Sequence, residues 1–282
     1  IDWSKISPAI FGSMFQSVMN PTERRNLGAH YTSETNILKL IKPLFLDDLW
    51  KEFENIKDNK NKLGEFHKKI STYHFLDPAC GCGNFLIITY RELRLLELEV
   101  LRVLNKSGQR VIDVSSIILI DVDQFYGIEY EEFPARIAEV AMWLIDHQMN
   151  MIVSNEFGQY FVRLPLKKAA QIRHADALET DWESVVTKND LSFIIGNPPF
   201  IGHQWRNDAQ KKGMEKVFGD SKRAGRLDYV TAWYLKAAQL IQGTKIKVAF
   251  VSTNSIVQGE QTSILWEQLF KKSLLSGKSV KW

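Results

Sequence analysis

Apolar residues along this 282-residue chain follow two alternating patterns. Short apolar runs stop at glycine, proline or an acidic residue, which is typical of buried strands, and longer segments carry apolar residues three or four positions apart, as on one face of a helix. The sequence predicts strands over 73–79, 125–129, 171–175, 191–195 and 247–252. It predicts helices over 84–104, 133–149, 229–241 and 264–270.

Repeated strand and helix units predict a parallel sheet with right-handed crossovers and helices on both faces. We therefore expect a Rossmann-like α/β fold with a mainly parallel sheet. Ahead of it, residues 1–20 have helical spacing that ends at Asn20-Pro21, and a second helix with an apolar face starts at Thr32 or Ser33. The segment 51–70 is rich in lysine, asparagine and aspartate and reads as a solvated insertion. We expect two units, a helical N-terminal segment over 1–70 and a core over 71–282.

Composition bears on the cellular location of the protein and on whether it holds disulfides or a metal. The chain is 45% hydrophobic, and no apolar run reaches the roughly 18 residues that a membrane span requires. We expect no membrane association and a cytoplasmic location. Cys80 and Cys82 are the only cysteines, too few for a disulfide framework or a zinc site, so we expect no metal. The chain starts at Ile1 without methionine, and we expect it to be a segment of a longer protein.

The first predicted strand runs into a glycine turn, Asp77-Pro78-Ala79-Cys80-Gly81-Cys82-Gly83-Asn84, that opens a long helix. Glycines there let the backbone approach a ligand, and the helix start adds free N–H groups. The spacing from Gly81 to Gly83 is shorter than the dinucleotide fingerprint, which argues against a nicotinamide cofactor. The Asp77 carboxylate would repel a pyrophosphate and suits an ammonium group.

Two further acidic residues end the next two predicted strands. Glu129 follows the second strand, where a carboxylate can bind both ribose hydroxyls, and Asp176 follows the third, where it can accept an adenine amine. Together with Asp77 these acids describe a pocket for a ligand with an ammonium group, a ribose and an adenine. We therefore expect the ligand to be S-adenosylmethionine.

The fourth predicted strand ends in Asn197-Pro198-Pro199-Phe200. An exocyclic amine on a heterocycle is a weak nucleophile because its lone pair is delocalised into the ring. The side-chain oxygen of Asn197 and the carbonyl of Pro198 can accept both amine hydrogens, and a preorganised dipole stabilises the charge that develops on nitrogen. Phe200 can stack on the acceptor ring, which is worth about 1–3 kcal/mol per base.

These motifs, in this order, resemble the amino-methylating class I DNA methyltransferases, in particular the adenine-N6 group. Residues 24–35, 127–150 and 252–259 are similar in sequence to the corresponding segments of MmeI-like methyltransferases, which occur in single-chain restriction-modification enzymes. The resemblance implies that Asn197, Pro198, Pro199 and Phe200 form the catalytic motif. It implies a cofactor site in which Thr32, Asp77, Ala79 and Gly83 contact the methionine end, Glu129 the ribose, and Tyr130, Asp176 and Ala177 the adenine, with Gly81 in the turn.

The same resemblance implies double-stranded DNA as the partner and an adenine flipped out of the duplex. Between Ile201 and Leu227 a local excess of four positive charges could grip phosphates. The resemblance also implies a recognition domain after a core that stops before its last strands, and it leaves an attached nuclease open. Three alternatives remain. The motif also fits cytosine-N4 methylation and protein glutamine-N5 methylation, and the pocket could belong to a nucleic-acid-binding scaffold that uses no cofactor.

Overall fold

The computed structural model describes residues 8–18, 31–105, 116–158, 169–219 and 224–273. Five strands form one sheet in the order β3-β2-β1-β4-β5, and every pair of neighbours is parallel. The strands are β1 (His74–Asp77), β2 (Phe125–Glu129), β3 (Gln171–His174), β4 (Leu191–Gly196) and β5 (Lys247–Phe250). The predicted α/β fold with a parallel sheet is confirmed, and all five strands lie within one or two residues of their predicted bounds.

The strand order reverses direction between β1 and β4. From β1 the chain goes outward through β2 to β3, and it then returns to the other side of β1 for β4 and β5. The loops leaving β1 and β4 therefore diverge at the carboxyl end of the sheet. In open α/β sheets this switch point opens the crevice in which ligands bind.

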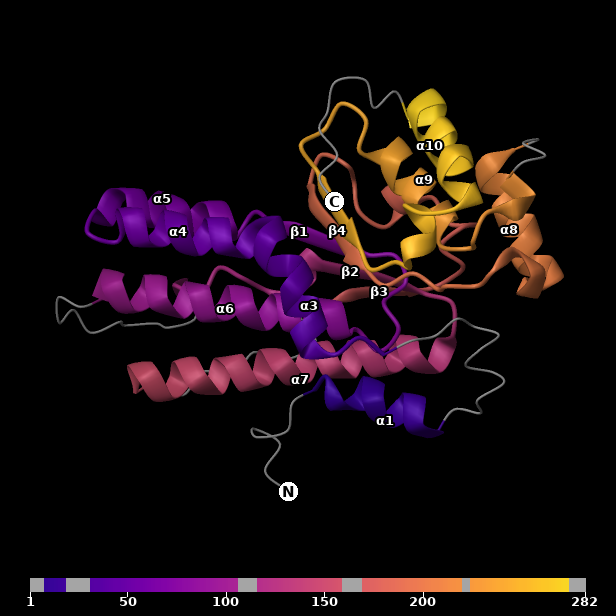
Figure 1. Ribbon diagram of the computed structural model, residues 1–282. Helices are drawn as coiled ribbons and strands as arrows, with labels where there is room; N and C mark the ends of the chain where they lie inside the picture. Colours follow the sequence, from indigo (N-terminus) through magenta and orange to yellow (C-terminus); the bar gives the residue numbers. More distant parts are fainter. Residues whose placement is uncertain (1–7, 19–30, 106–115, 159–168, 220–223, 274–282) are drawn as a thin grey trace.

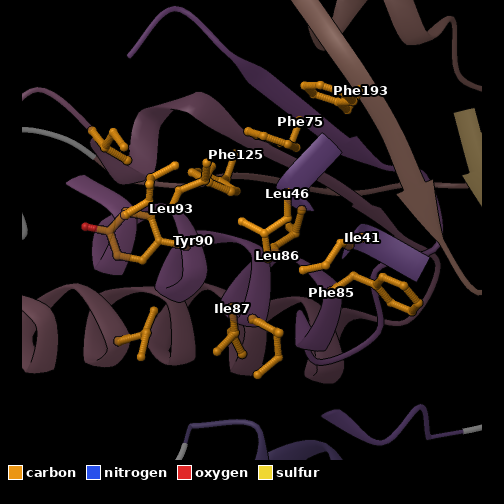
Figure 2. Packing of buried hydrophobic residues seen from close by; sticks show 14 of the residues in the cluster. Ile41, Leu46, Phe75, Phe85, Leu86, Ile87, Tyr90, Leu93, Phe125 and Phe193 are labelled. Atoms are coloured by element: carbon orange, nitrogen blue, oxygen red, sulfur yellow. The ribbon is translucent and has the colours of Figure 1, made fainter. Parts of the chain in front are cut away.

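One face of the sheet carries the larger hydrophobic core. The helices α6 (Asn84–Asn105) and α7 (Glu132–Phe157) lie along this face (Figure 1). Phe75 of β1 stacks between Phe125 of β2 and Phe193 of β4, with both ring centroids 5.1 Å away. Figure 2 shows these rings above Phe85, Leu86 and Tyr90 of α6. Neighbouring strands therefore share one aromatic layer.

The opposite face is covered by α8 (Asp208–Phe218), α9 (Thr231–Leu240) and α10 (Glu260–Ser273) (Figure 1). Leu76 and Ile194 point into this second core, whereas their neighbours Phe75 and Phe193 point into the first. This alternation is the period of two expected for strands that are buried on both faces.

The N-terminal part of the chain is helical, as predicted. It contains α1 (Ile10–Val18), α3 (Glu34–Ile41), a π-helical turn η2 (Lys42–Leu46), α4 (Asp47–Ile56) and α5 (Lys60–Ile70). Ser33 is the N-cap of α3 by position, although its side chain makes no capping hydrogen bond. The described part of α1 agrees with the first predicted helix, and Asn20-Pro21 lies outside the described residues.

The segment 51–70 is not a solvated insertion, and that prediction was wrong. It contains most of α4 and all of α5, whose apolar side chains lie in the first core: Leu49, Phe53, Leu63, Phe66 and Ile70. The many lysines lie mostly on the outer face of these helices. They dominate the composition of the segment, so the apolar residues spaced about four positions apart were overlooked. High local charge therefore marked an amphipathic helix pair here.

Two other features differ from the predictions, an additional helix and the end of α7. The polar stretch 201–227 holds the helix α8, which buries Met214 and Phe218 and starts with a capping box between Asn207 and Gln210. The helix α7 runs eight residues beyond 149 and ends at Gly158, whose φ of 64° is left-handed. A glycine in this conformation is the usual C-terminal stop of a helix.

A buried ionic network joins α6 to α7 and α5, far from the carboxyl end of the sheet. Arg94, with a fully buried side chain, contacts Asp146 at 3.3 Å, Asn150 at 3.0 Å and Glu97 at 3.1 Å. Glu97 also lies 2.9 Å from His67 of α5. A buried charge needs partners of this kind, and the network fixes the three helices relative to one another.

No helix within the described ranges is long and apolar enough to cross a bilayer.

Candidate active site

A cavity opens at the carboxyl end of the sheet, on both sides of the switch point. Its walls come from the turn after β1, the ends of β2, β3 and β4, and the segments around α3, α8 and α9. Among the predicted site residues, those that line this cavity are Thr32, Ala79, Gly81, Glu129, Tyr130, Asp176, Ala177, Asn197 and Pro199. One continuous space therefore contains residues of both the glycine turn and the Asn-Pro-Pro motif.

The glycine turn uses its two glycines differently. Gly81 lines the cavity with a φ of 54°, and a Cβ added there would meet nothing within 4 Å. Gly83, with a φ of 85°, faces α7 instead, where a Cβ would lie 3.1 Å from Ala138. Gly81 leaves room for a ligand against the backbone, and Gly83 permits the close approach of α6 and α7.

Asp77 ends β1 as predicted, but it is fully buried and does not line the cavity. Its Oδ1 accepts the backbone N–H of Ala79 at 3.0 Å, and its Oδ2 has no hydrogen-bond partner among the described residues. Burial raises the pKa of this carboxyl to about 8, and the nearby Glu129 adds to the shift. An adjacent cation would stabilise the ionised form and satisfy the unbonded oxygen.

Glu129 links the end of β2 to the glycine turn. Its Oε2 accepts the N–H of Gly81 at 2.8 Å and its Oε1 accepts the N–H of Glu131 at 2.9 Å. Burial raises the pKa of Glu129, while these two backbone hydrogen bonds oppose the shift. The carboxylate is thereby held at the cavity wall with acceptor capacity left on both oxygens. Asp176 lies on the adjacent wall, where its Oδ1 accepts the N–H of Leu178 at 2.7 Å.

Asn197 lies at the end of β4, and its side chain reaches the N-terminal segment. Its Nδ2 donates a hydrogen bond to Thr32 Oγ1 at 2.8 Å. Pro199 lines the cavity, whereas Pro198 is buried and outside the lining. Phe200 is half-buried against the second core and is also outside the lining. The structure thus places Asn197 and Thr32 together in the cavity and sets the Phe200 ring apart from it.

Several lining residues were missed or weakly signalled in the sequence. Asn207 and Gln210, at the start of α8, face the cavity, as does Tyr229. The Asn-x-x-Gln spacing of a capping box was a readable sign of a helix start at that point. Trp233 also lines the cavity, and its Nε1 donates to the Pro78 carbonyl at 2.9 Å, so α9 is attached to the turn after β1.

Part of the positive charge in the basic stretch 201–227 is buried or paired with acidic side chains. Arg206 is buried and donates to the Gly225 carbonyl at 2.5 Å. Lys211 pairs with Asp208 at 3.0 Å, and Lys216 pairs with Glu179 at 2.9 Å. The side chains of Lys212 and Arg226 are exposed, and Lys222 and Arg223 lie outside the described residues.

The cavity suits the ligand that the strand ends predicted. The open backbone at Gly81 fits a ligand in close contact, and Glu129 offers acceptors for two hydroxyls. The unbonded carboxylate oxygen of Asp77 would suit an ammonium group, but it is buried behind the residues that line the cavity. No cluster of three or more His, Cys, Asp and Glu side chains that could hold a metal occurs in the described part of the chain.

The strand order and the cavity at the switch point define a Rossmann-like, doubly wound α/β fold with its ligand site at the carboxyl end of the sheet. The family described as "MmeI, DNA-methyltransferase domain" matches residues 53–282, and this chain belongs to it. The structure is similar to that of the Type IIL restriction-modification enzyme MmeI in complex with DNA. The TM-score is 0.92 with 62% sequence identity, over 96% of this chain and 36% of that one.

DNA methyltransferase A of Bacillus subtilis (strain 168) is 44% identical over 289 residues, which cover all of this chain and 32% of the relative. The DrdV–DNA complex shares the fold at a TM-score of 0.51 with 18% identity, over 94% of this chain and 24% of that one. The chain thus spans about a third of the length of MmeI and of the Bacillus relative. It corresponds to the methyltransferase part of proteins that are much longer.

Proposed function

We propose that this chain transfers a methyl group from S-adenosylmethionine to the N6 amine of an adenine in double-stranded DNA, as the modification part of a restriction-modification enzyme. The observation that supports this most directly is the single cavity that contains both the glycine turn at Gly81 and the amide of Asn197. A transfer between two molecules requires that both bind in one space with their reacting atoms in contact.

The cofactor half of the proposal uses residues from three strand ends. Asp77 lies beside the glycine turn and would be held ionised by the ammonium group, Glu129 would accept hydrogen bonds from the ribose hydroxyls, and Asp176 would accept the adenine amine. Tyr130 and Ala177, which line the same wall, would contact the adenine ring. When bound, S-adenosylmethionine supplies an electrophilic methyl group on its sulfonium.

The acceptor half rests on the end of β4. Asn197 Oδ1 and the Pro198 carbonyl would each accept one N–H of the target amine, which localises the lone pair on nitrogen. The two prolines fix the backbone that carries these acceptors, so little reorganisation is needed as positive charge develops. The extra proton on nitrogen leaves to solvent after the transfer, so no strong base is required.

The proposal that DNA is the acceptor rests on the side chains that follow the reaction motif and on family membership. Directly after the reaction motif, the side chain of Trp205 is 67% exposed, and Lys212 and Arg226 are exposed on the same segment. Exposed aromatic and basic side chains are the groups that stack on unpaired bases and bind phosphates. We propose that this segment meets the duplex around the flipped adenine, with Phe200 at the edge of the acceptor site.

The test is methyl transfer by the full-length protein that carries this chain. The protein is incubated with unmodified duplex DNA and S-adenosylmethionine labelled in its methyl group, and the DNA is then digested to nucleosides. We expect label in N6-methyladenine. Label in N4-methylcytosine would replace the proposed base, label in protein would favour a protein amide as acceptor, and no label anywhere would contradict the proposal.

A further inference from the structure

The amide of Asn197 is connected to a residue 165 positions earlier in the chain. Asn197 Nδ2 donates a hydrogen bond to Thr32 Oγ1 at 2.8 Å, and both residues line the cavity. Thr32 directly precedes the N-cap of α3, yet its hydroxyl is turned toward β4 and away from the helix start. The contact therefore joins the N-terminal segment to the reaction motif across the cavity.

Both ends of this hydrogen bond are held by independent packing. On the Thr32 side, α3 is anchored in the first core by Ile37 and Ile41, and its Glu34 pairs with Arg91 of α6 at 2.7 Å. On the other side, the residue before Asn197 is fixed in the sheet, because the Gly196 carbonyl accepts the N–H of Val251 at 2.9 Å. The bond thus connects two rigid elements and sets the rotation of the amide between them.

The orientation of this amide decides what it can do for an amine. A carboxamide has an acceptor oxygen at one side and a donor NH₂ at the other. If the NH₂ of Asn197 faced the target amine, two donors would oppose each other and the lone pair would not be localised. Because the NH₂ is directed to Thr32, the Oδ1 end of the amide points away from the Thr32 hydroxyl, where it is buried beside the cavity that Asn197 lines.

We propose that Thr32 is a positioning residue that acts through Asn197, accepting the amide N–H so that Oδ1 is presented to the amine of the target base. This inference rests on the proposed function and adds a determinant of the transfer step itself. Thr32 also lines the cavity, so the competing view is that it only contacts the cofactor. The two views differ in the kinetic constant that they affect.

The test compares Thr32→Val and Thr32→Ser in the full-length protein, with methyl transfer measured at saturating DNA over a series of S-adenosylmethionine concentrations, so that kcat and the cofactor KM are both obtained. Valine keeps the size and removes the hydroxyl, and serine keeps the hydroxyl. We expect Thr32→Val to lower kcat by about 10- to 100-fold with little change in the cofactor KM, as for loss of one transition-state hydrogen bond. We expect Thr32→Ser to stay within about threefold of wild type, because it retains the acceptor.

Two controls separate positioning from loss of structure. Ser33→Ala changes the neighbouring residue, whose side chain makes no capping bond, and we expect it to leave both constants unchanged. Binding of S-adenosylhomocysteine, measured by calorimetry, shows that each variant is folded. If Thr32→Val does not fold, Thr32→Ala is compared with Thr32→Ser in its place.

A rise in the cofactor KM with normal kcat would overturn the inference, and so would wild-type kinetics in Thr32→Val. An inactive wild-type protein would instead contradict the proposed function, so the two failures are distinguishable. Recovery of kcat by serine but not by valine is the result that only a hydroxyl-dependent role predicts.

Discussion

Asp77 and Gly196 meet where the strand order reverses, and the contact leaves no room for a side chain. A Cβ on Gly196 would lie 2.4 Å from Asp77 Oδ1, closer than any real contact of that kind. The glycine directly precedes Asn197, and the aspartate is the first residue of the glycine turn. The acceptor motif and the cofactor turn are therefore in van der Waals contact through these two residues, before any ligand is considered.

We expect Gly196→Ala to destabilise the protein by about 1–3 kcal/mol, the usual range for overpacking a filled site, and to reduce methyl transfer severely. Either the carboxylate or the end of β4 must move to admit the methyl group. Thermal unfolding and methyl transfer measure the two effects. The matched control is Gly64→Ala in α5, where an added Cβ meets nothing within 4 Å and alanine favours the helix. Equal behaviour of the two variants would contradict this packing argument.

The raised pKa of Asp77 makes stability depend on pH in a defined direction. Its pKa is about 8 in the folded protein and 3.8 ordinarily, so the folded state holds the proton more tightly. The stabilisation is complete below about pH 4, declines as pH rises toward 8 and is flat above that. We expect the unfolding temperature to fall across this window, and Asp77→Asn to reduce the slope. The raised pKa of Glu129, which burial causes, contributes a decline of the same sign. A slope unchanged in Asp77→Asn would argue against this assignment.

The ionised form of Glu129 is expected to matter for the cofactor. Glu129→Gln keeps one oxygen for the Gly81 N–H and removes the charge that strengthens hydrogen bonds to hydroxyls. We expect the affinity for S-adenosylhomocysteine, measured by calorimetry, to fall by roughly tenfold, about 1.4 kcal/mol. The exposed Glu132→Gln is the control and should bind normally. Normal binding by both variants would remove Glu129 from the proposed ribose site.

Arg94 lies away from the cavity, and its substitution should lower the free energy of unfolding. Arg94→Met removes one partner of a buried ionic network and leaves Asp146 and Glu97 without their cation, which should cost about 3–5 kcal/mol. Arg102→Met breaks exposed pairs with Glu99 and Glu156 and should cost less than about 1 kcal/mol. Denaturant unfolding compares the two. Similar losses would show that the network does not carry the stability assigned to it.

Most of the fold could be predicted from the sequence because its signals are local. Short apolar runs that end in Asp77, Glu129 or Gly196 mark buried strands whatever their neighbours are. The prediction was wrong over 51–70, where surface lysines dominate the composition, although residues such as Leu63 and Phe66 keep a helical spacing. It also missed α8, because a short capped helix in a polar stretch differs little from a loop in composition.

The candidate site shows the same limit of local signals. The strand-end residues Glu129, Asp176 and Asn197 could be grouped because parallel strands end at one edge of the sheet. The contact between Thr32 and Asn197 could not be predicted, since it depends on how α3 packs against α6, and no local pattern encodes that packing. Likewise, only tertiary structure shows that Asp77, which was expected to face a ligand in the pocket, is fully buried and has a raised pKa.

The central claim is that Asn197 belongs to the acceptor half of a two-ligand transferase, separate from cofactor binding. Asn197→Ala in the full-length protein tests this most directly, with S-adenosylhomocysteine binding and methyl transfer to DNA measured on the same preparation. We predict cofactor affinity within about threefold of wild type and a loss of transfer of at least about 100-fold, the effect of removing one preorganised dipole at the reacting atom. Transfer at the wild-type rate, or a loss of cofactor binding that accounts for the lost activity, would contradict the claim.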